Sequence, residues 1–199
     1  MNKNRHSHYF VVLHCFIGGL LVMTAIAPSV FCDDRPVGQP AMHIARLAGI
    51  SNFCKVDDGF YRGGYPDNQG LVYLKKIGIK VIIDLRGGKA SVSKERREAE
   101  ALGFKYINIP FGFLYKPPVD SEIRKFLKIT TGPLNRPLFV HCQNGRDRTG
   151  AMVALYRITV NGWQIENAYS EAKDFGFHPI WRFLRDFILK EAVKFRDKK

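Results

Sequence analysis

The stretch H-C-Q-N-G-R-D-R-T-G, residues 141–150, decides the fold, because each fixed position of its pattern H-C-x5-R-T-G has a separate chemical task. The thiolate of Cys142 can attack a phosphorus atom, and the planar guanidinium of Arg148 can donate to two phosphate oxygens. The five residues between them can curl the backbone into a cup of N–H groups that suits a dianion. Gly145 can take a backbone angle that a side chain would resist. The stretch therefore predicts a phosphate site with Cys142 and Arg148 as catalytic residues.

The residues on either side supply the strand and the helix that such a loop needs. Residues 137–140, Pro-Leu-Phe-Val, form a short apolar run that favours a buried strand. Residues 149–156 are typical of the start of a helix, whose positive dipole end would point at a bound anion and at the thiolate. A chance Cys and Arg at this spacing would lack both neighbours.

The remainder of the chain alternates between strand and helix patterns. We expect further strands at 60–62, 81–86 and 104–109, and helices at 67–77, from 91 or 93 to 102, from 120 or 121 to 132, 163–175 and 179–195. This order predicts an α/β fold with a central mixed, mostly parallel sheet of four to five strands flanked by helices. The domain is expected to occupy residues 50–195, after a surface lead-in over 33–49 and before a basic tail at 196–199.

Residues 1–32 are expected to lie outside the fold. Lys3 and Arg5 are the only charged residues before Asp33, and the apolar stretch after them matches a secretory signal. Cleavage after Ala27 and cleavage after Cys32 both remain open. The stretch is also long enough to span a bilayer. We therefore expect an exported, periplasmic or secreted protein, with a membrane anchor over residues 1–32 as the alternative.

The charge of the chain limits the kinds of partner. The 199 residues carry a formal net charge of +13, which attracts anions such as phosphorylated substrates and an anionic membrane surface. Nucleic acid is disfavoured, because the sequence has no zinc-finger spacing, no aromatic RNA-binding signature and no long basic block. The sequence contains no ligand cluster that calls for a metal. We therefore expect no metal and no cofactor, and we expect a monomer.

The motif resembles the signature loop of the cysteine-dependent protein tyrosine and dual-specificity phosphatase superfamily. Residues 61–66, Y-R-G-G-Y-P, and 83–86, I-D-L-R, are similar to landmarks of the atypical dual-specificity phosphatases. Residues 155–158 and 161–163 resemble the region after the loop in exported bacterial members of that class. The resemblance covers residues 50 to 190 and implies hydrolysis of phosphate monoesters through a phosphocysteine intermediate.

The resemblance also implies a role for each part of the loop. His141 is expected to orient the loop from within the fold, and Thr149 can donate a hydrogen bond to the cysteine sulfur. Outside the loop, Arg62, Asp84 and Arg86 are expected to pair inside the fold rather than to contact substrate. The residues expected to bind phosphate are Gln143, Asn144, Gly145, Arg146, Asp147 and Arg148.

The general acid is the open point of the site, because the leaving alkoxide needs a proton. Members of the superfamily usually supply it from an Asp on a loop well before the cysteine. Here the corresponding segment, 111–119, contains no acid and carries Lys116 instead. Asp147, inside the signature, and Asp120, which can also cap the following helix, are the candidates. We favour Asp147 as the acid over Asp120.

Cys54 raises a question about the state of the nucleophile. If residues 1–32 are removed, Cys54 and Cys142 are the cysteines that remain. In an oxidising compartment they can form a disulfide, which would silence Cys142. The reading that we favour is that Cys54 is a small buried hydrophobic residue.

Three functions follow from these observations. The leading one is an exported phosphatase that acts on phosphotyrosine in proteins, and on phosphoserine and phosphothreonine. The second keeps the chemistry but acts on a phosphoinositide or an inositol phosphate, which the second cation Arg146 would suit. The third is a phosphate-binding module without turnover, which the absence of an acid in 111–119 favours and the intact Cys142 and Arg148 disfavour.

Overall fold

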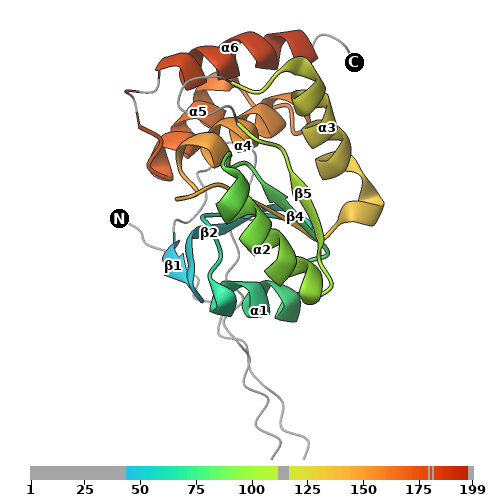
Figure 1. Ribbon diagram of the computed structural model, residues 1–199. Helices are drawn as coiled ribbons and strands as arrows, with labels where there is room; N and C mark the ends of the chain where they lie inside the picture. The colour runs from blue at the N-terminus through green and yellow to red at the C-terminus, as the bar shows by residue number, and fades with distance from the viewer. Residues whose placement is uncertain (1–43, 112–116, 179, 181, 197–199) are drawn as a thin grey trace, which may run out of the picture.

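A computed structural model describes residues 44–111, 117–178, 180 and 182–196. Its centre is a six-stranded sheet of order β1-β2-β3-β6-β4-β5 with helices on both faces (Figure 1). The strands are β1 (Ile44–Leu47), β2 (Ile50–Asp57), β3 (Phe60–Gly63), β4 (Val81–Asp84), β5 (Lys105–Asn108) and β6 (Leu138–His141). The helices are α1 (Asn68–Lys76), α2 (Lys89–Ala101), α3 (Asp120–Thr131), η1 (Pro133–Asn135), α4 (Asp147–Thr159), α5 (Ile165–Asp174) and α6 (Arg182–Arg196).

The predicted α/β class is confirmed, with a mixed and mostly parallel sheet. Strands β3, β6, β4 and β5 pair in parallel, whereas β1 and β2 add an antiparallel edge. The predicted strands correspond to β3, β4, β5 and β6, whereas β1 and β2 are additional strands at the antiparallel edge. The sheet therefore begins at Ile44, before the domain start expected at Ile50.

Neither β1 nor β2 was predicted from the sequence pattern. Strand β2 alternates poorly, because Ser51, Asn52 and Lys55 interrupt its apolar residues, yet Asn52 and Lys55 are buried. These polar residues are buried because the strand has neighbours on both sides, β1 and β3. The position of β2 therefore depends on its pairing with β1 and β3. It could not be predicted from an alternation of apolar and polar residues.

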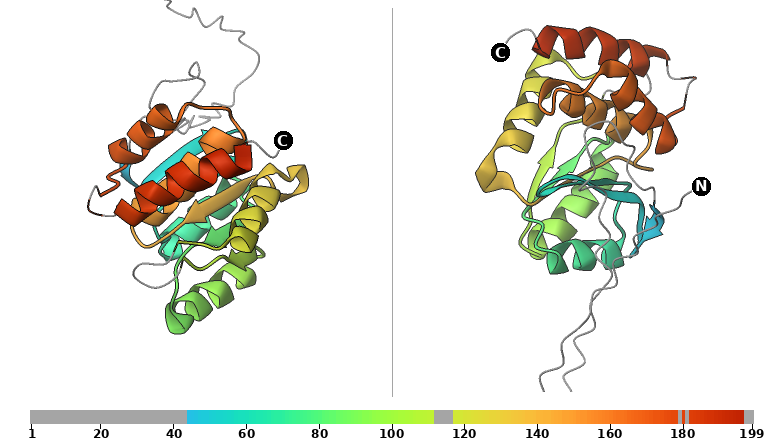
Figure 2. Two further views of the ribbon diagram at one scale, coloured as in Figure 1. Left: turned by 90° about the horizontal axis from the view of Figure 1, so that it is seen from above. Right: turned by 180° about the vertical axis from the view of Figure 1, so that it is seen from behind.

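Two apolar clusters lie on opposite faces of the sheet. Helices α3 to α6 cover one face, and α1 and α2 cover the other, as both views in Figure 2 also show. Successive side chains of a strand point to opposite faces. On β6, Leu138 and Val140 join the α4 side, whereas Phe139 and His141 point toward α1 and α2. This alternation turns His141 away from the loop that follows it.

Helix α4 is the central helix of the larger layer. Every residue from Thr149 to Thr159 is buried, because the sheet covers one side of the helix and α5 and α6 cover others. A buried ion pair joins it to α5, where Arg157 Nη2 lies 2.8 Å from Glu171 Oε1. The helix begins at Asp147, earlier than the Thr149 start expected, so Asp147 and Arg148 belong to its first turn.

None of the helices in the described part of the chain is long and apolar enough to cross a membrane.

Substitution of Phe139 tests the packing of the smaller apolar cluster, on the α1 and α2 side of the sheet. Phe139 is fully buried on the central strand β6 and lies against Phe53, with ring centroids 6.1 Å apart. Phe139→Ala is expected to lower the free energy of unfolding by about 3–5 kcal/mol, because the cavity adds to the lost burial. Leu134→Ala, at a side chain that is 92% exposed, is the control and should change it by less than about 0.5 kcal/mol. Equal effects in urea titrations would contradict this packing.

Candidate active site

The signature loop joins the end of β6 to the start of α4. Cys142 is 3% exposed and lies at the bottom of this turn. Backbone N–H groups of Gly145 and Thr149 donate hydrogen bonds to its sulfur, and the Thr149 hydroxyl does so as well. The loop amides therefore point inward, as a cup for an anion requires. The predicted hydrogen bond from Thr149 to the cysteine is present.

The surroundings of Cys142 favour the thiolate. Burial by itself would raise the pKa of the Cys142 thiol, but the charge of Arg148 and the hydrogen bonds from Thr149 and Gly145 outweigh burial and lower that pKa. Arg148 is half-buried in the first turn of α4. The structure thus brings together the two residues that the sequence predicted as catalytic.

The carbonyl groups of the loop point outward and are held by donors. The backbone N–H of Tyr65 donates to Gln143 O at 3.1 Å, and Asn52 Nδ2 donates to Asn144 O at 2.7 Å. Ser51 Oγ reaches the same Asn144 oxygen at 3.4 Å. Fixing the carbonyls outward leaves the N–H groups free to point inward. Gln143 and Asn144, predicted to bind phosphate, have exposed side chains, so the loop uses their backbone groups in these contacts.

Two glycines, Gly145 and Gly64, let the loop approach strand β3 and the turn after it. Gly145 has a φ of +71°, and a Cβ there would lie 2.5 Å from the carbonyl carbon of Gly63. A Cβ on Gly64 would lie 2.2 Å from Ser51 Oγ and 3.1 Å from Gln143 O. No side chain fits in either gap. The segment Y-R-G-G-Y-P is therefore the surface on which the loop rests.

Arg62 supports the loop from below. It is 1% exposed, and its Nη2 donates to Gly145 O at 2.8 Å. Its guanidinium carbon lies 3.9 Å from the ring centroid of Phe175, while Nε and Nη1 have no hydrogen-bond partner. Burial lowers the pKa of Arg62 to about 10, so it still carries its charge at neutral pH. The sequence placed Arg62 inside the fold but did not reveal this contact with the loop.

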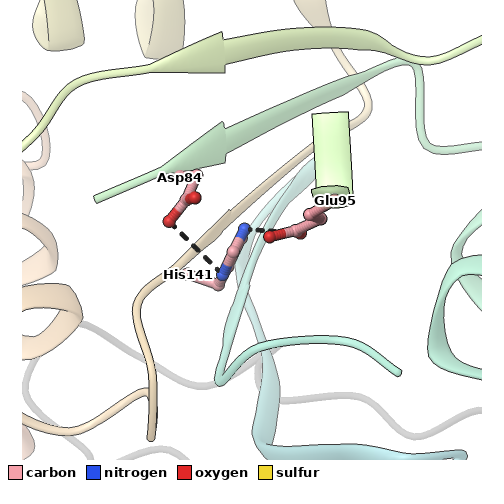
Figure 3. Close-up of side chains that lie close together, drawn as sticks. All are labelled: Asp84, Glu95 and His141. Atoms are coloured by element: carbon pink, nitrogen blue, oxygen red, sulfur yellow. Dashed lines mark ion pairs between the residues drawn. The ribbon is translucent and has the colours of Figure 1, made fainter. Parts of the chain in front are cut away.

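His141 lies in a buried polar network behind the loop. Its Nε2 lies 3.1 Å from Glu95 Oε1 and its Nδ1 lies 3.9 Å from Asp84 Oδ1 (Figure 3). Nδ1 also lies 3.2 Å from Cys142 O. Burial alone would lower the pKa of His141, but the charges of Glu95 and Asp84 outweigh it and raise that pKa. This confirms that the side chain points into the fold, as the sequence predicted.

The same cluster has the residue types of a metal site, with its three ligand atoms within 4.8 Å of one another. A guanidinium already occupies the position of a cation, because Arg86 Nη2 lies 2.9 Å from Asp84 Oδ2 and also contacts Glu95. Tyr106 donates its hydroxyl hydrogen to Asp84 Oδ2 at 2.6 Å. Arg86 and His141 therefore balance the two carboxylates without a metal, and the cluster is an internal support.

The two candidate acids lie in different surroundings. Asp147 Oδ1 accepts a hydrogen bond from the backbone N–H of His178 at 2.8 Å and lies 3.0 Å from His178 Nδ1. Asp120, at the start of α3, contacts Lys194 of α6 with both oxygens at 2.5 Å. Asp120 is thus bound to a cation on another helix, whereas Asp147, in the first turn of α4, contacts His178 of the turn after α5. Residues 112–116 of the predicted acid loop, with Lys116, lie outside the described residues.

Cys142 is a free thiol, so the disulfide with Cys54 that the sequence allowed is not formed. Cys54 is fully buried, as we favoured, but it is disulfide-bonded rather than a free hydrophobic residue. Its partner lies outside the described residues. The nucleophile is therefore available in this structure.

Thr149→Val tests the electrostatics of the thiol. Loss of the hydroxyl removes one hydrogen bond to the sulfur, so the pKa of Cys142 should rise toward that of an ordinary thiol. The rate of alkylation by iodoacetamide against pH, corrected with Cys142→Ser, measures this pKa. Thr131→Val, at an exposed threonine of α3, is the matched control and should leave the profile unchanged. A profile that Thr149→Val does not move would contradict the assigned hydrogen bond.

Arg62→Met tests the support beneath the loop. The substitution keeps an apolar chain over Phe175 but leaves the carbonyl of Gly145 unpaired, at a cost of about 1–3 kcal/mol in unfolding free energy. Binding of inorganic phosphate, measured by calorimetry, should weaken because the cup is less firmly held. Arg97→Met, at an exposed arginine of α2, serves as the control. Unchanged phosphate binding in Arg62→Met would show that the loop holds its shape without Arg62.

Known proteins match this fold and this loop. A Dictyostelium discoideum protein named as a probable tyrosine-protein phosphatase is 31% identical over 151 residues, covering 74% of this chain and 87% of its own. An Arabidopsis thaliana inositol diphosphatase is 28% identical over 127 residues, covering 62% of this chain. The chain spans 63% of the length of that plant relative, a little under two thirds.

Solved structures show the same architecture. The catalytic domain of the PP-IP phosphatase SIW14 from S. cerevisiae superposes with a TM-score of 0.59 at 22% identity, covering 72% of this chain and 92% of its own. At this identity the match concerns the fold. The family model described as a DSP-PTPase phosphatase fused to NAD+ kinase matches residues 46–178. This chain therefore belongs to the DSP-PTPase phosphatase family, as the resemblance of its signature loop indicated.

Proposed function

We propose that this chain is an exported cysteine-dependent phosphatase that hydrolyses phosphate monoesters of proteins, phosphotyrosine first and phosphoserine or phosphothreonine as well. The observation that supports the reaction class best is the lowered pKa of the buried thiol of Cys142, caused by Arg148 and by the N–H and hydroxyl donors around it. A lone buried cysteine would have a raised pKa instead. The site therefore favours a thiolate nucleophile over an inert thiol.

The proposed reaction has two steps. The thiolate of Cys142 attacks phosphorus in line, so that the S–P bond forms as the bond to the leaving oxygen breaks. Arg148 and the inward N–H groups stabilise the charge on the equatorial oxygens, where most of the catalytic effect arises in phosphoryl transfer. Water then cleaves the phosphocysteine. Thr149, whose hydroxyl donates to the sulfur, stabilises the departing thiolate.

A cavity beside the loop supports a peptide substrate. It has a volume of about 420 Å³ and is lined by Tyr65, Asp67, Asn68, Gln69 and Lys94. It adjoins the loop, because the backbone N–H of Tyr65 donates to Gln143 O. An aromatic ring, a cation and a carboxylate together fit a polypeptide around a phosphorylated residue. The carboxylate of Asp67 would repel a ligand that carries many phosphates.

An inositol phosphate or a phosphoinositide is the second candidate. Arg146 is exposed in the loop and adds a second cation beside Arg148. The relatives named as inositol diphosphatases have comparable identity to this chain. Both substrate classes would use the same cysteine chemistry, so the choice between them depends on groups outside the cup.

The proposal of export comes from residues 1–32 alone. The charges at Lys3 and Arg5, followed by an apolar stretch, support a secretory signal, and a membrane anchor is the alternative. The net charge of +13 would also suit contact with an anionic membrane surface.

One panel of substrates tests the proposed function. Phosphate release is measured with phosphotyrosine and phosphothreonine peptides, phosphoinositides and inositol phosphates under reducing conditions. Phosphotyrosine peptides should be cleaved fastest, and Cys142→Ser should lower turnover by more than about 10³-fold, since the nucleophile is lost. Faster release from inositol phosphates would select the second candidate. Release that survives Cys142→Ser, or no release on any substrate, would refute the cysteine-dependent mechanism.

A further inference from the structure

Four successive residues of the turn after α5 lie against the signature loop or against Arg62, which supports the loop: Phe175, Gly176, Phe177 and His178. Phe175 stacks on Arg62, which holds Gly145. A Cβ on Gly176 would lie 3.2 Å from Arg146 Cδ, and one on Gly150 would lie 3.4 Å from Phe177 Cδ2. His178 contacts Asp147. The turn is therefore a wall of the site, although it follows the loop by about 30 residues.

Local sequence explains the shape of this turn. Gly176 has a φ of +80°, which closes α5 with a left-handed residue. The N–H of Gly176 donates to Lys173 O at 2.8 Å, and the N–H of Phe177 donates to Ala172 O at 3.0 Å. This pair of hydrogen bonds is the Schellman motif, which fixes the direction of the chain after the helix. His178 follows directly and is brought to the first turn of α4.

The contact between His178 and Asp147 sets the roles of the two groups. Asp147 Oδ1 accepts the backbone N–H of His178, and both carboxylate oxygens lie within 3.2 Å of Nδ1. The carboxylate of Asp147 therefore accepts hydrogen bonds from the N–H groups of His178. It fixes the imidazole with a hydrogen on Nδ1, and thus leaves Nε2 as the atom that can gain and lose a proton.

Nε2 of His178 is also accessible. The side chain is 48% exposed, and no described residue forms a hydrogen bond with Nε2. His178 contacts Asp147, which lies between Arg146 and Arg148 in the signature loop. Histidine is the side chain whose charge changes nearest neutral pH, and it is the commonest general acid. Asp120, the other candidate, is held by Lys194.

We infer that His178 is the general acid of this phosphatase and that Asp147 is the residue that positions it, an inference that rests on the proposed function. In the first step, the S–P bond forms, the P–O bond breaks and the proton on Nε2 passes to the leaving oxygen. In the second step, neutral His178 takes a proton from the attacking water, the P–O bond forms and the S–P bond breaks. Inorganic phosphate, the thiolate and protonated His178 result.

His178→Gln tests the inference through the leaving group. With benzyl phosphate, whose alkoxide needs a proton, turnover should fall by about 10²-fold, the usual contribution of a general acid. With 4-nitrophenyl phosphate, whose leaving group is stable as an anion, the rate of the first step, measured as the burst of 4-nitrophenol, should stay within about threefold of the wild type, although hydrolysis of the phosphocysteine slows with both esters. Asp174→Asn, at the exposed residue that ends α5, is the control and should change the turnover of neither substrate.

The double variant separates a positioning Asp147 from an acid Asp147. If Asp147 acts through His178, Asp147→Asn in the His178→Gln background should add no further loss on benzyl phosphate. A larger loss in Asp147→Asn than in His178→Gln would make Asp147 the acid and overturn the inference. Inhibition by inorganic phosphate and the thermal midpoint should be unchanged in His178→Gln, which shows that the loop is intact.

Each remaining outcome is decisive. Equal losses in the rate of the first step on both esters, or no loss on either, would leave His178 with a structural role or none. A wild type that cleaves only 4-nitrophenyl phosphate would lack an effective acid. Residual activity in Cys142→Ser would refute the proposed function itself, and a wild type inactive on both esters would refute function and inference together.

Discussion

The site depends on one constraint, namely that the carbonyls of the signature loop are held outward so that its N–H groups point inward. The donors that hold them come from β2, β3 and the turn after β3: Ser51, Asn52, Arg62 and Tyr65. The hydrogen bond from Arg62 satisfies the buried carbonyl of Gly145, which would cost about 1–3 kcal/mol if it were unpaired. The anion site is thus built before any anion binds, as electrostatic catalysis requires.

Charge is arranged in two layers around this loop. Close to the sulfur, the charge of Arg148 and the hydrogen bonds from Thr149 and Gly145 together outweigh the effect of burial and lower the thiol pKa. Behind the loop, Asp84 and Glu95 are balanced by Arg86 and by His141, the residue before the nucleophile. Because these charges are buried, each needs a partner close by. The network fixes the end of β6, and so the point from which the loop starts.

Much of this arrangement was predictable from residues that are close in the sequence. The strand, the loop and the following helix lie within residues 137–160, and the roles of Cys142, Gly145 and Thr149 follow from their spacing. The parallel strands β4 and β6 were found from short apolar runs. Strands β1 and β2 were not, because Asn52 and Lys55 are polar residues that only the pairing of strands buries. The contact of Arg62 with Gly145 joins residues 83 positions apart and has no local signal.

The sequence by itself determined the reaction class, because a cysteine, an arginine and a glycine at fixed spacing within one turn already define a phosphate cup. It offered Asp147 and Asp120 as candidate acids and did not indicate His178. Tertiary structure alone decided their surroundings, since Lys194 comes from α6 and His178 from the turn after α5. Hydrogen bonds within a loop are set by local spacing, whereas a contact between distant segments depends on how the helices pack on the sheet.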